Sequence, residues 1–168
     1  MKKIIVALIL LGTFSATSFA QRVAVVDINK ILDSMNDYKD AQKKLDDQTA
    51  LWRQEINTEM DKVKGMYNKY QAELPLMNDE TKVARENEIT AKEKAVRDKQ
   101  REYFGDDGLL FKKQQDLIKP IQDRVYKAID DYASERGYDL ILDKSKASGI
   151  LFVNTTIDKT DDIMKKIK

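Results

Sequence analysis

The sequence contains no cysteine and no histidine. Without cysteine no disulfide can form, so the stability of the fold has to come from packing or from association of chains. Histidine is the commonest general base and the commonest metal ligand, and its absence excludes most hydrolase triads and most zinc sites. The 168 residues also include only two prolines, which leaves long stretches free to form helices.

A long hydrophobic run is missing as well. The longest uninterrupted run, Ile4 to Leu11, is shorter than the roughly 20 residues that cross a bilayer. Two lysines precede this run and the small-residue pattern Ser18-Phe19-Ala20 follows it, an arrangement typical of a secretory signal peptide. We therefore predict that residues 1–20 are a signal peptide, cleaved after Ala20, and that the mature protein begins at Gln21.

The chain has little excess charge of either sign. Removing Lys2 and Lys3 with the signal peptide takes the 30 basic residues to 28, against 29 acidic residues. A strongly basic chain would have indicated nucleic acid or an anionic surface as the partner. This balance supports neither, and we expect no nucleic-acid partner.

Short strand-like segments bracket a long, charged, helix-favouring segment between Asn29 and Arg136. The strand-like segments are 22–27, 138–142 and 150–153, and we expect the last two to form a hairpin. The charged segment has too few apolar residues to bury itself. We expect it to form an arm whose surface contacts partners, other copies of the chain or something that the arms enclose.

The arm is predicted to be a helical hairpin. Two series of apolar residues, each with seven-residue spacing, together give the three-and-four pattern of a coiled-coil seam: Ile56, Val63 and Tyr70, and Met60, Tyr67 and Leu74. Pro75 disfavours helix in the residue before it, and Asn78 or Asp79 can cap a new helix, so the tip is predicted near residues 74–79. The 37 residues from Tyr38 to Leu74 would reach about 55 Å at ~1.5 Å per residue.

Glycines interrupt the returning half of the hairpin. Gly105 and Gly108 each cost a helix about 1 kcal/mol relative to alanine, so we expect a kink or loop there. The two glycines are candidate hinge residues for the arm, and a static kink is the alternative. Gly137 is predicted to stop the last long helix. Asp27 and Asp143 follow strands and are expected to form caps and turns rather than a catalytic pair.

Three pairs of segments carry a resemblance to a known family: Val23–Asp27 with Lys30–Met35, Pro120–Val125 with Gly137–Asp143, and Ala147–Asn154 with Ile157–Ile163. They resemble the Skp (OmpH) family of periplasmic chaperones, and the resemblance extends over essentially the whole mature sequence. It implies an α+β fold with three short strands per chain and a long helical hairpin inserted between strands 1 and 2. The small β body would be completed by oligomerisation as a homotrimer.

The resemblance implies an ATP-independent holdase that binds unfolded outer-membrane proteins in a cavity between helical arms and prevents their aggregation. It implies no enzyme activity, no cofactor and no metal. The resemblance also implies transient contact with the membrane or with lipopolysaccharide, although the charge balance of this chain does not support such a contact. A structural coiled-coil protein that spaces or tethers envelope components is the alternative function. The strand residues expected to build the shared body are Val23, Val25, Leu140, Leu142, Leu151 and Val153.

The resemblance also divides the chain. We expect a body formed by residues 21–37 and 110–168, and an arm formed by residues 38–109. On the arm, Trp52 is expected to pack against the returning helix, because a large aromatic at a seam position usually fills the seam. The apolar residues at the tip either contact clients or pack against each other, and the sequence does not decide between these alternatives. The predicted client-contact residues are Leu74, Leu76, Met77, Met60 and Tyr67.

Overall fold

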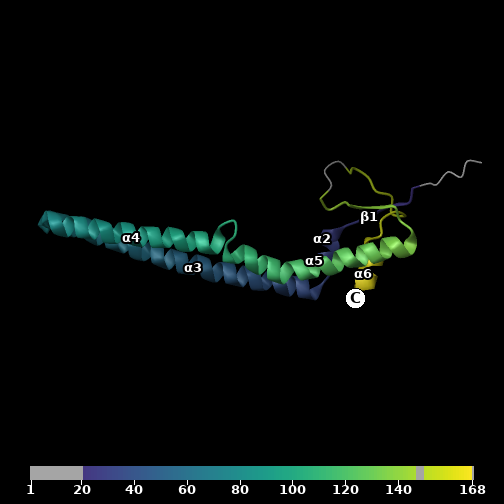
Figure 1. The fold of residues 1–168 in the computed structure, drawn as a ribbon, viewed down its shortest axis with the longest axis horizontal. Helices are drawn as coiled ribbons and strands as arrows, with labels where there is room; N and C mark the ends of the chain where they lie inside the picture. The colour runs from purple at the N-terminus through teal and green to yellow at the C-terminus, as the bar shows by residue number, and fades with distance from the viewer. Residues whose placement is uncertain (1–20, 147–149, 168) are drawn as a thin grey trace, which may run out of the picture.

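A computed structural model of the chain describes residues 21–146 and 150–167, and the predicted signal peptide lies outside them. Figure 1 shows a small body at one end of the molecule and a long arm of two helices at the other. In chain order the elements are β1 (Val23–Val26), α2 (Ile28–Asp33), α3 (Asn36–Glu73), the short 3₁₀ turn η1 (Leu74–Leu76), α4 (Asp79–Phe104), α5 (Leu109–Arg136), β2 (Leu140–Asp143) and α6 (Thr160–Ile167). No helix of the described residues is long and apolar enough to cross a membrane.

The sheet consists of β1 and β2, which pair in parallel with Val23 beside Leu140 and Val26 beside Asp143. Parallel strands need a crossover between them, and α2 to α5 form it. The long helical hairpin is therefore inserted between the first two strands, as the predicted fold class required.

The prediction of three strands in each chain is wrong for the described residues. Residues 150–153 form no strand and make no hairpin with β2. The other edge of β1 is occupied by a later segment, since Val25 N donates to Ile157 O at 2.8 Å and Lys159 N donates to Val25 O at 2.8 Å. β-branched composition indicates extended backbone, but it does not select the edge with which a segment pairs.

The main core lies where α2, α5 and α6 meet the start of α3. Its most deeply buried side chains are Val26, Ile31, Val125 and Ile163. Burying each of these side chains contributes about 1.5–3 kcal/mol relative to leaving it in water. The same cluster includes Ala41, and Leu45 packs against it, so the core continues past residue 38 into the segment that was expected to belong to the arm.

A narrower seam holds the arm together. Its buried residues are Trp52, Ile56 and Tyr70 on α3 and Ile89 on α4. The predicted seven-residue series that starts at Ile56 lies on this seam. Two members of the second series do not, because Met60 and Tyr67 are 53% and 51% exposed, whereas its third member, Leu74, is half-buried.

The seam positions of that second series belong to the residues one place earlier: Glu59, Met66 and Glu73, all half-buried. A glutamate can bury its methylene stem at such a position while its carboxylate stays in water. Glu59 does so beside Lys62, whose Nζ lies 2.6 Å from the Glu59 carboxylate. The prediction therefore had the correct seven-residue spacing, but Met60 and Tyr67 lie one residue past the seam positions.

The predicted helix ends and turns are confirmed. Asp27 and Asn78 are N-caps, accepting hydrogen bonds from Lys30 N at 2.9 Å and from Thr81 N at 2.8 Å. Gly137 ends α5 in the left-handed conformation, with φ of 65°. The Asp143 carboxylate accepts hydrogen bonds from the backbone N and the hydroxyl of Ser145, as expected of a turn residue.

Candidate interaction surfaces

Most exposed large apolar side chains of the described residues lie on the sheet with the loop that follows it or on the long arm, and Phe111 and Tyr126 are exposed on α5. In the described part of the chain, no three acidic side chains are grouped so that they could hold a metal ion. Every buried side-chain nitrogen or oxygen in the same residues has a hydrogen-bond partner. The exposed apolar side chains are candidate surfaces for contact with other macromolecules.

The sheet has a core side and an outer face. Val26 and Ile141 pack on the core side. Side chains alternate along a strand, so the residues between them point the other way. Leu140 and Leu142 on this other side are 49% and 39% exposed. We define the outer face as the paired residues Val23 and Leu140, and Val25 and Leu142.

The loop between β2 and α6, drawn in Figure 1 above the body, carries two of the three most exposed large apolar side chains of the described residues. Leu151 is 98% exposed and Phe152 is 82% exposed, whereas Val153 is half-buried. Covering a leucine or phenylalanine side chain contributes about 1.5–3 kcal/mol. This loop and the outer face hold all six predicted body residues, and of these only Val25 is fully buried.

Two exposed apolar side chains lie on one side of the arm. Met60 and Tyr67 are seven residues apart, so they lie about 20° apart around α3, next to the seam. Glu55 lies about 140° from Met60 around the same helix, and there Lys99 Nζ of α4 contacts its carboxylate at 2.6 Å. We call the side of α3 with Met60 and Tyr67 the apolar flank, and the side with the Glu55–Lys99 ion pair the ion-paired flank. The ion-paired flank also carries the exposed side chain of Leu51.

The tip residues differ among themselves. Leu76 is 88% exposed, while Leu74 and Met77 are half-buried. Val83 on α4 is 56% exposed and was not among the predicted client-contact residues. Val83 lies about 120° from the buried Ile89 around α4, so no helical periodicity connects these two residues.

An aromatic cluster fixes the middle of the arm. Trp52 is buried, as expected, and stacks on Tyr103 of α4 with ring centroids 4.9 Å apart. Phe104 meets Trp52 edge to face at 6.2 Å. The Glu55 carboxylate accepts hydrogen bonds from Lys99 Nζ and from the Tyr103 hydroxyl at 2.9 Å, and these bonds lower the pKa of Glu55.

The loop between α4 and α5 contains both candidate hinge glycines. A Cβ atom at Gly105 would lie 2.5 Å from Arg101 O, and one at Gly108 would lie 2.9 Å from Glu102 O. Both residues have negative φ, −66° and −70°. Close approach of the backbone therefore explains the two glycines without any need for an unusual conformation, and the hinge stays a prediction.

A half-buried polar network joins the end of the sheet to α6. The Asp158 carboxylate accepts hydrogen bonds from Lys144 Nζ at 2.7 Å and from the Thr160 hydroxyl at 2.6 Å. Burial opposes the charged form of Asp158, but these bonds outweigh it and hold the pKa at about 2. The Thr160 hydroxyl also accepts a hydrogen bond from Asp27 N, so the network fixes the segment that pairs with β1.

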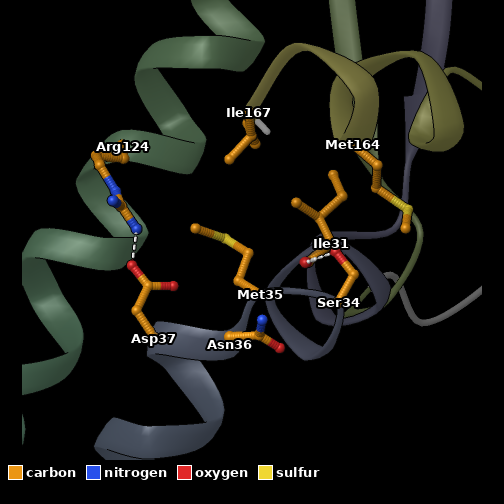
Figure 2. Close-up of a pocket in the computed structure, with 8 residues that line it drawn as sticks. All are labelled: Ile31, Ser34, Met35, Asn36, Asp37, Arg124, Met164 and Ile167. Atoms are coloured by element: carbon orange, nitrogen blue, oxygen red, sulfur yellow. Dashed lines mark hydrogen bonds and ion pairs between the residues drawn. The ribbon is translucent and has the colours of Figure 1, made fainter.

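A pocket of about 350 Å³ lies at the junction between body and arm. Figure 2 shows Met35 between the ion pair of Asp37 and Arg124 on one side and Ile31 of α2 on the other, with Ile167 of α6 above it. The pocket adjoins the main core, to which Ile31 belongs. Because its charged groups pair with each other, we assign it no ligand.

Known proteins resemble the chain over nearly its whole length. Residues 22–167 match the family model described as outer membrane protein (OmpH-like). The chaperone protein Skp of Yersinia enterocolitica is 25% identical over 159 residues, which cover 92% of this chain and 90% of that protein. Skp of Pectobacterium atrosepticum is 22% identical over 165 residues, with 95% and 93% covered.

The fold is also found in a solved structure. An OmpH-like outer membrane chaperone from Caulobacter crescentus has a TM-score of 0.65 to this chain at 14% identity. The match covers 92% of this chain and 89% of that one. The small sheet with a long inserted helical hairpin is therefore a shared fold, and the predicted fold class is confirmed at that level.

Proposed function

Since the chain belongs to the OmpH-like outer membrane protein family, we propose that it is an ATP-independent holdase chaperone that binds unfolded outer-membrane proteins and prevents their aggregation. The two Skp relatives are named chaperones and are matched over nine-tenths of their length or more. Chaperones of this family are periplasmic. Export with cleavage after Ala20 is part of the proposal.

The observation that carries the proposal is the apolar flank of the arm. An unfolded membrane protein exposes apolar segments, and side chains such as Met60, Tyr67 and Leu76 could cover them. Methionine suits contacts with varied sequences because its side chain is flexible and polarizable. The ion-paired flank would keep the complex soluble. Release needs no hydrolysis, because a client leaves when a membrane offers it a more favourable state.

Assembly as a homotrimer completes the proposal. A body with a two-stranded sheet is small for independent stability, and association of chains would bury more of its surface. We assign the contacts between chains to the outer face and to Leu151, Phe152 and Val153. The three arms would then surround a cavity for the client. Holding a client in this way requires no catalytic residue and no cofactor.

The holdase function is tested by light scattering. A urea-denatured outer-membrane β-barrel protein is diluted into buffer with and without a molar excess of the trimer. We expect scattering to be suppressed without added nucleotide. Unchanged aggregation at excess trimer would contradict the proposal.

The assembly is tested separately by sedimentation equilibrium. We expect the mass of three chains for the wild type and the mass of one chain for a variant with Leu151→Ser and Phe152→Ser. A matched control is Leu76→Ser at the arm tip, which should stay trimeric. A single-chain mass for the wild type would refute the trimer.

A further inference from the structure

A groove with an excess of positive charge lies on the body at the C-terminal end of α5. Its volume is about 510 Å³, and five basic and two acidic side chains line it. The end of α5 lies at the opposite end of the molecule from the arm tip (Figure 1). This local excess contrasts with the near balance of basic and acidic residues in the whole chain, 30 against 29.

Two arginines in the groove are held by aromatic rings. Tyr132 and Tyr138 stack with ring centroids 5.9 Å apart and an angle of 17° between their planes. The guanidinium of Arg22 lies 5.2 Å from the centroid of Tyr138, and that of Arg136 lies 5.8 Å from the centroid of Tyr132. Stacking on an aromatic face orients a guanidinium and leaves its N–H edge available for acceptors.

The acidic side chains of the groove already have partners. Glu135 accepts a hydrogen bond from Lys166 Nζ at 2.6 Å, and Asp162 accepts one from the Tyr132 hydroxyl at 3.0 Å. Asp139 lies close by, but its carboxylate accepts from the backbone N of Arg22 at 2.8 Å. Among the described residues, neither Arg22 nor Arg136 forms an ion pair. The two guanidinium groups are thus oriented but not neutralised.

We propose that this groove binds a phosphate-type oxyanion, with Arg22 and Arg136 as its principal ligands. The planar fork of a guanidinium donates two parallel N–H bonds to such a group, and Lys165 adds a further positive charge at the rim. Cleavage after Ala20 would add a positive α-amino group at Gln21, next to Arg22. The phosphate could belong to a lipid head group or be free in solution.

The site is compatible with the assembled protein. α5, α6 and the start of β1 form the groove. Arg22 precedes Val23, an outer-face residue, and side chains alternate, so Arg22 points to the helix side of the sheet. The proposed contacts between chains use the outer face and therefore leave the groove open. The inference does not depend on client binding.

The test compares two sources of phosphate. Protein secreted by a bacterial host is titrated with inorganic phosphate at constant ionic strength, and the Nε–Hε signals of arginine are followed by NMR. In a second arm, flotation with vesicles of phosphatidylglycerol and phosphatidylcholine is compared with flotation with phosphatidylcholine alone. The variants are Arg22→Gln and Arg136→Gln, with Arg136→Lys to keep the charge without the fork. The matched control is Arg53→Gln, an exposed arginine of the arm.

We expect saturable binding that either groove variant weakens by about tenfold. Arg136→Lys should fall between the wild type and Arg136→Gln, which a mere loss of folding would not produce. Binding in both arms identifies the phosphate group itself as the ligand, and binding to anionic vesicles alone identifies a lipid head group. The proposal is overturned if neither arm shows saturable binding, or if Arg53→Gln weakens binding as much as Arg136→Gln.

Discussion

Trp52 is the largest side chain buried in the arm, and it connects α3 to α4 through Tyr103 and Phe104. The returning helix α4 has only one buried residue of its own, Ile89. A polar helix of this kind is marginal in water without tertiary contacts. The pairing of the two arm helices therefore depends strongly on a few side chains.

Replacing Trp52 with alanine should destabilise the arm. We expect the free energy of unfolding to fall by about 3 kcal/mol, because the change removes an aromatic pair and leaves a cavity in a narrow seam. Urea unfolding followed by circular dichroism measures the loss. Met60→Ala is the matched control on the same helix, and its effect should stay within about 0.5 kcal/mol because Met60 is exposed. Equal effects of the two changes would contradict the role of Trp52.

Asp158 should make the body sensitive to acid. Its pKa is lowered from 3.8 to about 2 in the folded chain, so its stabilising contribution is fully present above about pH 4 and is lost as the pH falls towards 2. We expect a loss on the order of 2 kcal/mol over this range. The measurement is the difference in unfolding free energy between wild type and Asp158→Asn at pH 7 and at pH 2.

That difference should be large at pH 7 and close to zero at pH 2. Asp106→Asn, a change at an exposed acid in the loop between α4 and α5, serves as the control. A difference that does not depend on pH would show that the Asp158 carboxylate contributes through its shape and not through its charge.

At the scale of elements, the glycine loop that separates α4 from α5 shows how backbone packing shapes the arm. Gly105 N donates to Arg101 O at 2.8 Å and Gly108 N donates to Gly105 O at 2.8 Å, so the chain closes tightly on itself. The loop allows α4 to end against the middle of α3, while α5 continues along the body (Figure 1).

Alanine substitutions at two glycines should have opposite effects. At Gly105 the added Cβ would meet Arg101 O at 2.5 Å, so Gly105→Ala should destabilise the loop and speed amide hydrogen exchange in residues 101–109. Gly65 lies in α3 with nothing within 4 Å of an added Cβ, so Gly65→Ala should stabilise the helix by about 0.5–1 kcal/mol. Equal effects of both changes would refute the steric explanation.

Helix ends could be predicted from the sequence because they depend on neighbouring residues. Strand pairing and side-chain packing depend on contacts between distant elements and could not be predicted in the same way. Asn78, Gly137 and the two loop glycines act on neighbouring backbone, so helix ends could be placed. Which edge of β1 receives a partner depends on residues more than a hundred positions away, and residues 150–153 were therefore wrongly assigned to a strand. Met60 was wrongly placed on the seam because a spacing of four then three residues fits a heptad as well as a spacing of three then four.

The same limit applies to the candidate surfaces. Exposure of Met60 and Tyr67 agrees with their proposed contact with clients, but a sequence pattern cannot separate an exposed flank from a packed seam one residue away. The aromatic and arginine contacts of the groove at Tyr132 and Tyr138 were missed for another reason. Arg136 and Tyr132 are four residues apart on α5, but Arg22 contacts Tyr138 from the start of the proposed mature chain, and no local pattern connects those two positions.

At the scale of the whole molecule, the two flanks of the arm predict that clients are held on one side. Met60→Ser combined with Tyr67→Ser should weaken client affinity about tenfold, because two half-exposed apolar side chains are lost from the contact. Affinity is measured by fluorescence titration of a labelled, unfolded outer-membrane protein. Leu51→Ser is the matched control, since Leu51 is 60% exposed and lies about 180° from Met60 around α3.

The control should retain affinity within about twofold. Sedimentation of both variants should still give the wild-type mass, because neither change touches the body. If Leu51→Ser weakens the client as much as the double change, clients contact the arm on both flanks.

The placement of the hairpin between two paired strands also sets an order of events during the proposed export. Residues 22 and 139, which join the two strands at their start, are 117 positions apart, so the sheet cannot close until nearly the whole chain has crossed the inner membrane. Helices form from near neighbours within microseconds, and we expect the arm to fold while β1 is still unpaired. During that interval β1 is an unpaired apolar strand in the periplasm. It is then prone to aggregation, as the unfolded clients are.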